Sequence, residues 1–186
     1  GVDVLYDEKV NSTGYFVQHQ YQGNGLDTQV GIRLEDNDKF GTHTVGQGAV
    51  RYQILPLTSV YANIGSAFRA PTTNDLYATP WGANPNLKPE ESFSYEIGLD
   101  QKITDNLKAG ISAYRNEVND LITYVTDPIT YKGQLLNVKK ATFTGGEFNL
   151  DWAKDELFAN LSYAYVQPKD KETDKDLPRR SRQSLT

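Results

Sequence analysis

The feature that most constrains this chain is an alternation of apolar and polar residues that recurs in eight separate segments. Between residues 92 and 100, for example, aromatic and aliphatic side chains at the odd positions alternate with serine, glutamate, glycine and aspartate at the even ones. Period two indicates a β-strand with two chemically different faces, and no segment shows a comparable helical stripe. The pattern predicts an all-β fold with strands at residues 13–22, 26–35, 45–54, 58–67, 92–101, 106–116, 140–152 and 156–167.

The connections between these segments alternate between short and long. Short turns follow the first, third, fifth and seventh segments, whereas longer connections are predicted at 36–44, 68–91, 117–139 and from 168 onwards. All eight prolines fall in connections, as expected where a proline would interrupt a ladder of backbone hydrogen bonds. Strands of about ten residues, with short turns at one rim and long loops at the other, are typical of an antiparallel transmembrane β-barrel. The apolar stretch 121–125 is expected to continue a strand beyond the membrane.

Composition excludes several classes of protein. No apolar run approaches the roughly 20 residues of a membrane-spanning helix, which excludes a helical membrane protein. A net charge of −5 without a basic stripe argues against a nucleic-acid partner. The absence of cysteine rules out a disulfide framework and a thiolate metal site. Aromatic residues near the predicted strand ends would suit the interfacial girdles of a barrel: Tyr15, Tyr21, Tyr52, Trp152, Tyr163 and Tyr165.

The pattern leaves alternatives open, because a soluble β-sandwich or a lipocalin-like barrel also alternates. Charged residues in the middle of the predicted strands would lie on the polar face: Asp27, Arg33, Arg51, Glu96, Lys108, Glu147 and Asp151. In an open porin they would line water and bias ion selectivity. Eight strands could also close into a small barrel filled by side chains.

Enzymatic chemistry has little support in the sequence. The two histidines lie apart, His19 on the apolar face of a predicted strand and His43 in a predicted loop, and neither has a nucleophile beside it in a recognisable motif. Asp36 and Asp38 have the spacing of calcium ligands, but Phe40 stands where the next ligand belongs. The chain is therefore predicted not to be an enzyme, to carry no cofactor, and to have a solvated acidic turn here.

Several motifs, in order, resemble the barrel of TonB-dependent outer-membrane receptors. They are "GSAFRAPTTNDLY", "NPNLKPEES", "YEIGL", "YRNEVNDLI", "GGEFNLDW", "LSYAYV" and "LPRRSRQSLT", and they cover nearly the whole chain. Within that family, "EDNDKFGTHTVGQGAVRYQI" and "YRNEVNDLITY" are most similar to the cobalamin-receptor branch. Siderophore receptors share most of the same sequence motifs.

The resemblance implies a nutrient receptor of the Gram-negative outer membrane, in contact with lipid and driven by TonB. Its ligand would be cobalamin or, as the alternative, a ferric siderophore, and calcium could order loops in the parent receptor. The family also has a plug domain, a TonB box and many more strands, so residues 1–186 are expected to be a slice of a larger barrel. Aromatic and cationic residues on the longest loop are the candidate ligand contacts: Arg69, Tyr77 and Trp81.

Overall fold

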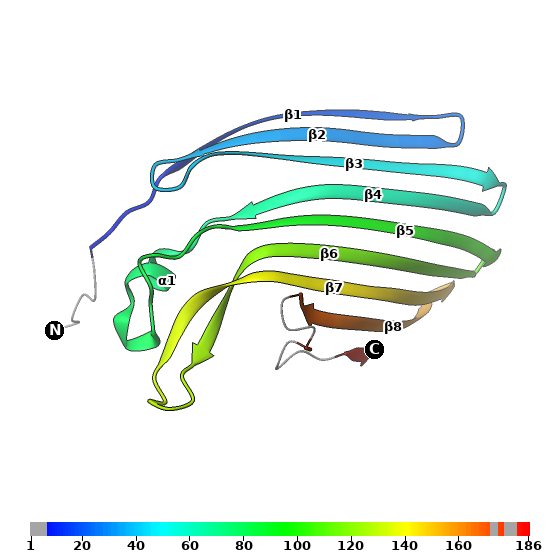
Figure 1. The fold of residues 1–186 in the computed structure, drawn as a ribbon. Coiled ribbons are helices and arrows are strands. Elements are labelled where there is room, and N and C mark those ends of the chain that lie inside the picture. Colours follow the sequence, from blue (N-terminus) through cyan, green and yellow to red (C-terminus); the bar gives the residue numbers. More distant parts are fainter. Residues whose placement is uncertain (1–6, 172–174, 177–181) are drawn as a thin grey trace.

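The strands form one antiparallel sheet (Figure 1), in a computed structural model that describes residues 7–171, 175–176 and 182–186. All eight predicted strands are present, and each is longer than predicted. A ninth strand pairs with the eighth through only three residue pairs. The strands are β1 Ser12–Gly23, β2 Leu26–Asn37, β3 Gly41–Leu55, β4 Thr58–Arg69, β5 Glu90–Thr104, β6 Leu107–Thr126, β7 Gly133–Lys154, β8 Leu157–Asp170 and β9 Gln183–Leu185.

Each strand pairs only with its neighbours in the sequence, and the sheet is open. Among the described residues β1 pairs with β2 alone and β9 with β8 alone, so the two edges do not meet. The sheet is one layer, as Figure 1 shows, and not the two packed layers of a sandwich. Neither a soluble sandwich nor a closed eight-stranded barrel is therefore the structure of this chain.

The two faces of the sheet differ as the alternation predicted. Residues directly opposite each other in an antiparallel pair share a face, and Val17 lies opposite Ile32 just as Ile97 lies opposite Ala113. These apolar side chains are uncovered: Val17 is 66% exposed and Ile97 65%. We call this face the outer face, because a bilayer would cover it. The seven mid-strand charges lie on the opposite, inner face, where Asp27 stands opposite Arg51 and Lys108 opposite Asp151.

Among the described residues, no helix is long and apolar enough to cross a bilayer.

The four short turns join neighbouring strands at one rim (Figure 1). Between β1 and β2, Asn24 and Gly25 have φ values of 52° and 75°, which match a type I′ hairpin turn. At the turn between β5 and β6, the Lys102 ammonium lies 2.7 Å from Asp105 Oδ1. The hydrogen bond from Lys102 holds the pKa of the Asp105 carboxyl below its ordinary value.

Three sequence predictions at the opposite rim were wrong. The connection at 36–44 is a three-residue turn, because Asn37 Oδ1 accepts hydrogen bonds from the amides of Lys39 and Phe40 and closes the chain early. His43 consequently lies in β3 and not in a loop. Most of 117–139 is strand, and the expected extension at 121–125 is confirmed as part of β6.

Pro168 was predicted to lie in a connection but lies within β8, opposite Phe143. The amide of Val166 donates to Arg182 and that of Asp170 to Lys175, so alternate amides of this segment point away from β7. Pro168 occupies the position between them on the same side. Its missing N–H therefore costs the ladder with β7 nothing, which explains why a proline is tolerated here.

Candidate functional site

The longest connection, residues 70–89, folds into a compact unit that we call the α1 loop. Helix α1 spans Thr73–Tyr77 and is followed by the short 3₁₀ helix η1, Thr79–Trp81. A capping box starts the helix: Thr72 Oγ1 accepts from the amide of Asp75, and Asp75 Oδ2 accepts from the amide of Thr72. Leu76, 1% exposed, and Leu87, 4% exposed, anchor the loop in a small core, so it has a defined shape.

Beside this loop, β6 and β7 continue past the rest of the sheet as a two-stranded arm, residues 120–137 (Figure 1). The arm starts at a kink. The register of the two strands is the same on either side of Asp120, since Asn119 lies opposite Lys140 and Leu121 opposite Val138. Asp120 has a φ of 53°, a value that few residues with a Cβ adopt.

Backbone and amide contacts fasten the arm to the α1 loop. The amide of Leu135 donates to Gly82 O at 2.7 Å, and Asn84 Nδ2 donates to Leu135 O at 3.0 Å. Gly82 has a φ of 74°, and a Cβ at this position would collide with Gly133 O and with the Tyr124 ring. Only a glycine permits this approach of the two backbones.

Asn137 secures the kink itself. Its Oδ1 accepts from the amide of Lys88 at 2.9 Å, and its Nδ2 donates to Lys88 O at 2.9 Å and to Asp120 O at 2.6 Å. One side chain thus ties the unusual backbone of Asp120 to the end of the α1 loop. The arm and the loop are therefore hydrogen-bonded to each other at the kink.

Arg69, the first predicted ligand contact, lies at the end of β4 and is held by carboxylates. Its guanidinium lies 3.0 Å from Glu90 Oε2 and 3.8 Å from Asp75 Oδ2. The other oxygen of Glu90, a residue 9% exposed, accepts from the amide of Ile122 at 2.7 Å. Arg69 therefore braces the loop against the arm, and its charge is balanced locally.

Tyr77, the second predicted contact, ends helix α1 and is also engaged. Lys39, in the turn between β2 and β3, donates a hydrogen bond to the Tyr77 hydroxyl. The Lys39 ammonium lies 4.5 Å from the centre of the Tyr77 ring, a cation–π contact. Arg69, at the end of β4, and Tyr77, in the α1 loop, thus contact different partners. For Trp81 the backbone lies in η1, and the side chain lies outside the described part of the structure.

The arm ends in a turn at residues 127–132 that is closed by Asp127. Its Oδ1 accepts from the amides of Ile129 and Thr130, each at 2.8 Å. These two amides, that of Thr130 first, hold the pKa of the Asp127 carboxyl below its ordinary value. The turn displays two large apolar residues, Ile129 and Tyr131, which are 85% and 83% exposed.

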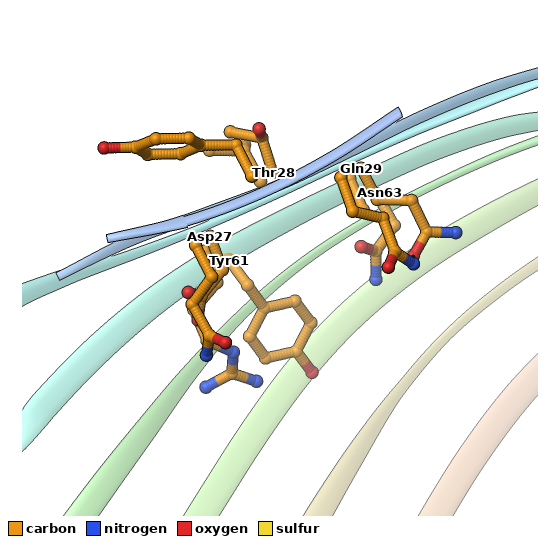
Figure 2. Close-up of a pocket in the computed structure, with 11 residues that line it drawn as sticks. Asp27, Thr28, Gln29, Tyr61 and Asn63 are labelled. Carbon is orange, nitrogen blue, oxygen red and sulfur yellow. The ribbon is translucent and has the colours of Figure 1, made fainter. Parts of the chain in front are cut away.

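The inner face carries a second candidate surface, a shallow cavity of about 480 Å³. Figure 2 shows Asp27, Gln29, Tyr61 and Asn63 on one side of the sheet and Thr28 on the other. Arg51 also lines the cavity, pairs with Asp100 at 2.5 Å and lies 5.0 Å from the Tyr61 ring centre. The Tyr61 hydroxyl donates to Glu96 at 3.0 Å. This wall offers a connected polar surface.

The acidic turn of β2 and β3 directs its carboxylates to neighbouring side chains. Asp36 accepts from the Thr42 hydroxyl at 2.9 Å, and Asp38 accepts from the backbone and side-chain amides of Asn11. In the described residues, no group of three or more His, Asp or Glu side chains is positioned to hold a metal ion.

Sequence reasoning missed the residues that join the loop to the arm and the residues at the arm tip. Asn84 and Asn137 are separated by more than 50 positions, so no local pattern connects them. The tip gives a local signal in retrospect, since "TDPITYK" combines a turn-forming Asp-Pro with two apolar residues that no strand face requires.

A family model described as TonB dependent receptor-like, beta-barrel, matches residues 2–186. The chain is 37% identical over 187 residues to a protein named vitamin B12 transporter BtuB from Photobacterium profundum, and 31% identical over 179 residues to one of the same name from Vibrio vulnificus. These alignments cover 99% and 96% of this chain but only 30% and 29% of the two relatives. The chain therefore spans less than a third of their length.

Among solved structures, the chain is similar to a mutant of the ferric enterobactin receptor PfeA of Pseudomonas aeruginosa in complex with enterobactin. The TM-score is 0.78 at 24% sequence identity, over 95% of this chain and 30% of that one. At this level of identity the likeness concerns the fold alone.

Proposed function

The chain belongs to the TonB-dependent receptor β-barrel family, a family of outer-membrane transport receptors, and from that premise we propose that it forms part of the barrel of a cobalamin receptor. The whole receptor would lie in the outer membrane of a Gram-negative bacterium, bind cobalamin at its external loops and import it with energy from TonB. The proposal that the substrate is cobalamin rests on the 37% identity, over 99% of this chain, to a protein named vitamin B12 transporter.

The geometry of the long-loop rim is consistent with a ligand-binding role. The α1 loop and the arm are joined by hydrogen bonds from Asn84 and Asn137, so they would present a preorganised surface. Binding to a preorganised surface loses less conformational entropy than binding to mobile loops. The outer face supplies the apolar belt that would keep this rim at the membrane surface.

The alternative substrate of the same family is a ferric siderophore, which is commonly anionic. A receptor for such a chelate needs cations that are free to meet it. Arg69 is held by Glu90 and Asp75, and Lys39 by Tyr77. The charge balance at Arg69 favours a ligand with little net charge, and hence cobalamin, whereas the neutral Tyr77 engages the Lys39 ammonium without balancing its charge.

The polar inner wall fits a receptor whose interior is occupied by the plug domain of the family. Arg51, Asp100 and Tyr61 would then hydrogen-bond the plug, whereas in a passive porin the same groups would line water. We favour the plug because the family consists of active-transport receptors.

The test uses the complete receptor that contains residues 1–186, purified in detergent micelles. Cyanocobalamin and ferric enterobactin are titrated separately and binding is followed by tryptophan fluorescence, with heat-modifiable gel mobility as the check that the barrel is folded. Saturable binding of cyanocobalamin, together with uptake that disappears in a tonB-deficient strain, is expected. If only ferric enterobactin gives saturable binding, the proposal of cobalamin is wrong and the substrate is a siderophore.

A further inference from the structure

The arm tip has a large aromatic residue at a position where the backbone conformation favours glycine. Tyr131 has a φ of 55°, in the left-handed region that disfavours residues with a Cβ. Its amide donates to Asp127 O at 2.9 Å, so the turn holds the residue in this state. The side chain is 83% exposed, and a glycine would adopt the same backbone with less strain. Strain held at an exposed aromatic residue points to a role outside the fold.

Ile129 adds a second exposed apolar group two positions away, and the turn fixes where it points. Its amide is one of the two that donate to Asp127 Oδ1, and the amide of Asp127 donates to Lys132 O at 2.9 Å. The β7 strand of the arm is fastened to the α1 loop below the tip, where the Leu135 amide donates to Gly82 O. The two apolar side chains are therefore displayed on a braced support.

The chemistry of the tip suits one kind of ligand. The charges of Asp127 and Lys132 cancel, and Ile129 and Tyr131 offer an apolar surface with one hydroxyl. An extended ring system with amide substituents, such as a corrinoid, would cover these side chains and hydrogen-bond the hydroxyl. A ferric catecholate chelate carries negative charge and would gain little from them.

We propose that Ile129 and Tyr131 form an apolar ligand contact that selects an extended ring ligand of low charge over an anionic metal chelate. The inference rests on the proposed function and names a part of the binding surface. Aromatic anchors that become buried on binding commonly dominate the affinity of an interface. Removing both side chains is therefore expected to weaken cyanocobalamin binding by about tenfold or more, with no loss of the folded barrel.

The experiment compares four forms of the complete receptor in detergent micelles. The wild type is titrated with cyanocobalamin beside the double variant Ile129→Ser/Tyr131→Gly, the variant Tyr131→Phe and the control Leu57→Ser. Glycine at 131 keeps the positive φ, and phenylalanine keeps the ring. Leu57 is 50% exposed in a turn of the opposite rim, so its substitution removes a comparable apolar side chain away from the ligand.

The expected result is weakened binding in the double variant, binding close to wild type in Tyr131→Phe, and no effect of Leu57→Ser. If the wild type binds cyanocobalamin and the double variant binds it equally well, the tip contact is overturned while the proposed function stands. The tip would then be free for a macromolecular partner. If the wild type binds ferric enterobactin and not cyanocobalamin, both the proposed substrate and the selectivity of the tip are overturned.

Discussion

The two rims of the sheet are held together in different ways. At the short-turn rim each turn is closed by its own few residues, as Asn24 and Gly25 show for the first hairpin, and is tied to the adjacent strand by single backbone hydrogen bonds such as that from the Gln53 amide to Gly25 O. At the long-loop rim the α1 loop and the arm are joined by residues about 50 positions apart, such as Asn84 with Leu135 and Lys88 with Asn137. A local turn tolerates change in its neighbours, whereas a cross-connected rim transmits a change at one residue to both of its parts.

The largest difference between the rims is expected when a glycine of nearly equal φ is replaced in each of them, Gly82 at the long-loop rim and Gly25 at the short-turn rim. Gly82→Val adds a Cβ that collides with Gly133 and Tyr124, whereas a Cβ at Gly25 meets Gln53 at ordinary contact distance. We expect Gly82→Val to cost about 3 kcal/mol, from backbone strain and overpacking together. Gly25→Val should cost about 1 kcal/mol, from strain alone.

Hydrogen exchange of the Leu135 amide, which donates to Gly82 O, would measure the first effect. Exchange there should accelerate strongly in Gly82→Val and stay unchanged in Gly25→Val. Equal acceleration in both variants would show that the two rims are not independent.

A smaller effect is expected from the neighbouring glutamates Glu90 and Glu91. Glu90→Ala leaves the Ile122 amide without its acceptor and removes the nearer partner of Arg69, which should cost about 2 kcal/mol locally. Glu91 pairs with His43 at 3.6 Å and its side chain is 63% exposed, so Glu91→Ala should cost less than about 1 kcal/mol.

The readout is exchange of the Ile122 amide together with protease cleavage of the α1 loop. Both should increase in Glu90→Ala only. A loop that stays resistant in that variant would mean that Asn84 and Asn137 hold it without help from Glu90.

The smallest effect is a pH dependence at the arm tip. The pKa of Asp127 is lowered in the folded turn by the amides of Thr130 and Ile129, so the carboxylate stabilises the turn above the unfolded pKa, near 4. That stabilisation is lost as the pH falls through the folded pKa. Titration of the Asp127 carboxyl carbon by NMR should give a midpoint below that of the same carboxyl in a short peptide. Equal midpoints would show that the turn is not closed by this side chain.

The sequence predicted the parts of the fold that depend on neighbouring residues. Period two located every strand through β8 and assigned Val17 and Ile97 to one face and Asp27 to the other. It placed the start of β3 too late, because the hydrogen bonds of Asn37 shorten a turn that looked long. The prediction that Pro168 lies in a connection was wrong because a proline breaks a strand only at a position where the ladder needs a backbone N–H.

The candidate site was less accessible to sequence reasoning. Tyr77 lies in the loop where it was predicted, whereas Arg69, predicted in the same loop, is the last residue of β4. Their partners Lys39 and Glu90 depend on how separate segments meet. A cation in a loop looks available to a ligand until the structure shows which carboxylate holds it. Tyr131 was not predicted because exposure and a positive φ are properties of a folded turn and leave only a weak trace in residue type.

The sequential pairing of the strands also has a kinetic consequence. Every ladder joins segments adjacent in the chain, so each new hairpin closes a short loop at small entropic cost. The sheet can grow one hairpin at a time, which favours rapid assembly. The contacts of Asn84 with Leu135 and of Lys88 with Asn137 close far longer loops, and β5 and β6 shorten these loops only once they have paired. The rim that carries the proposed ligand contact is therefore expected to be the last part of this segment to acquire its native structure.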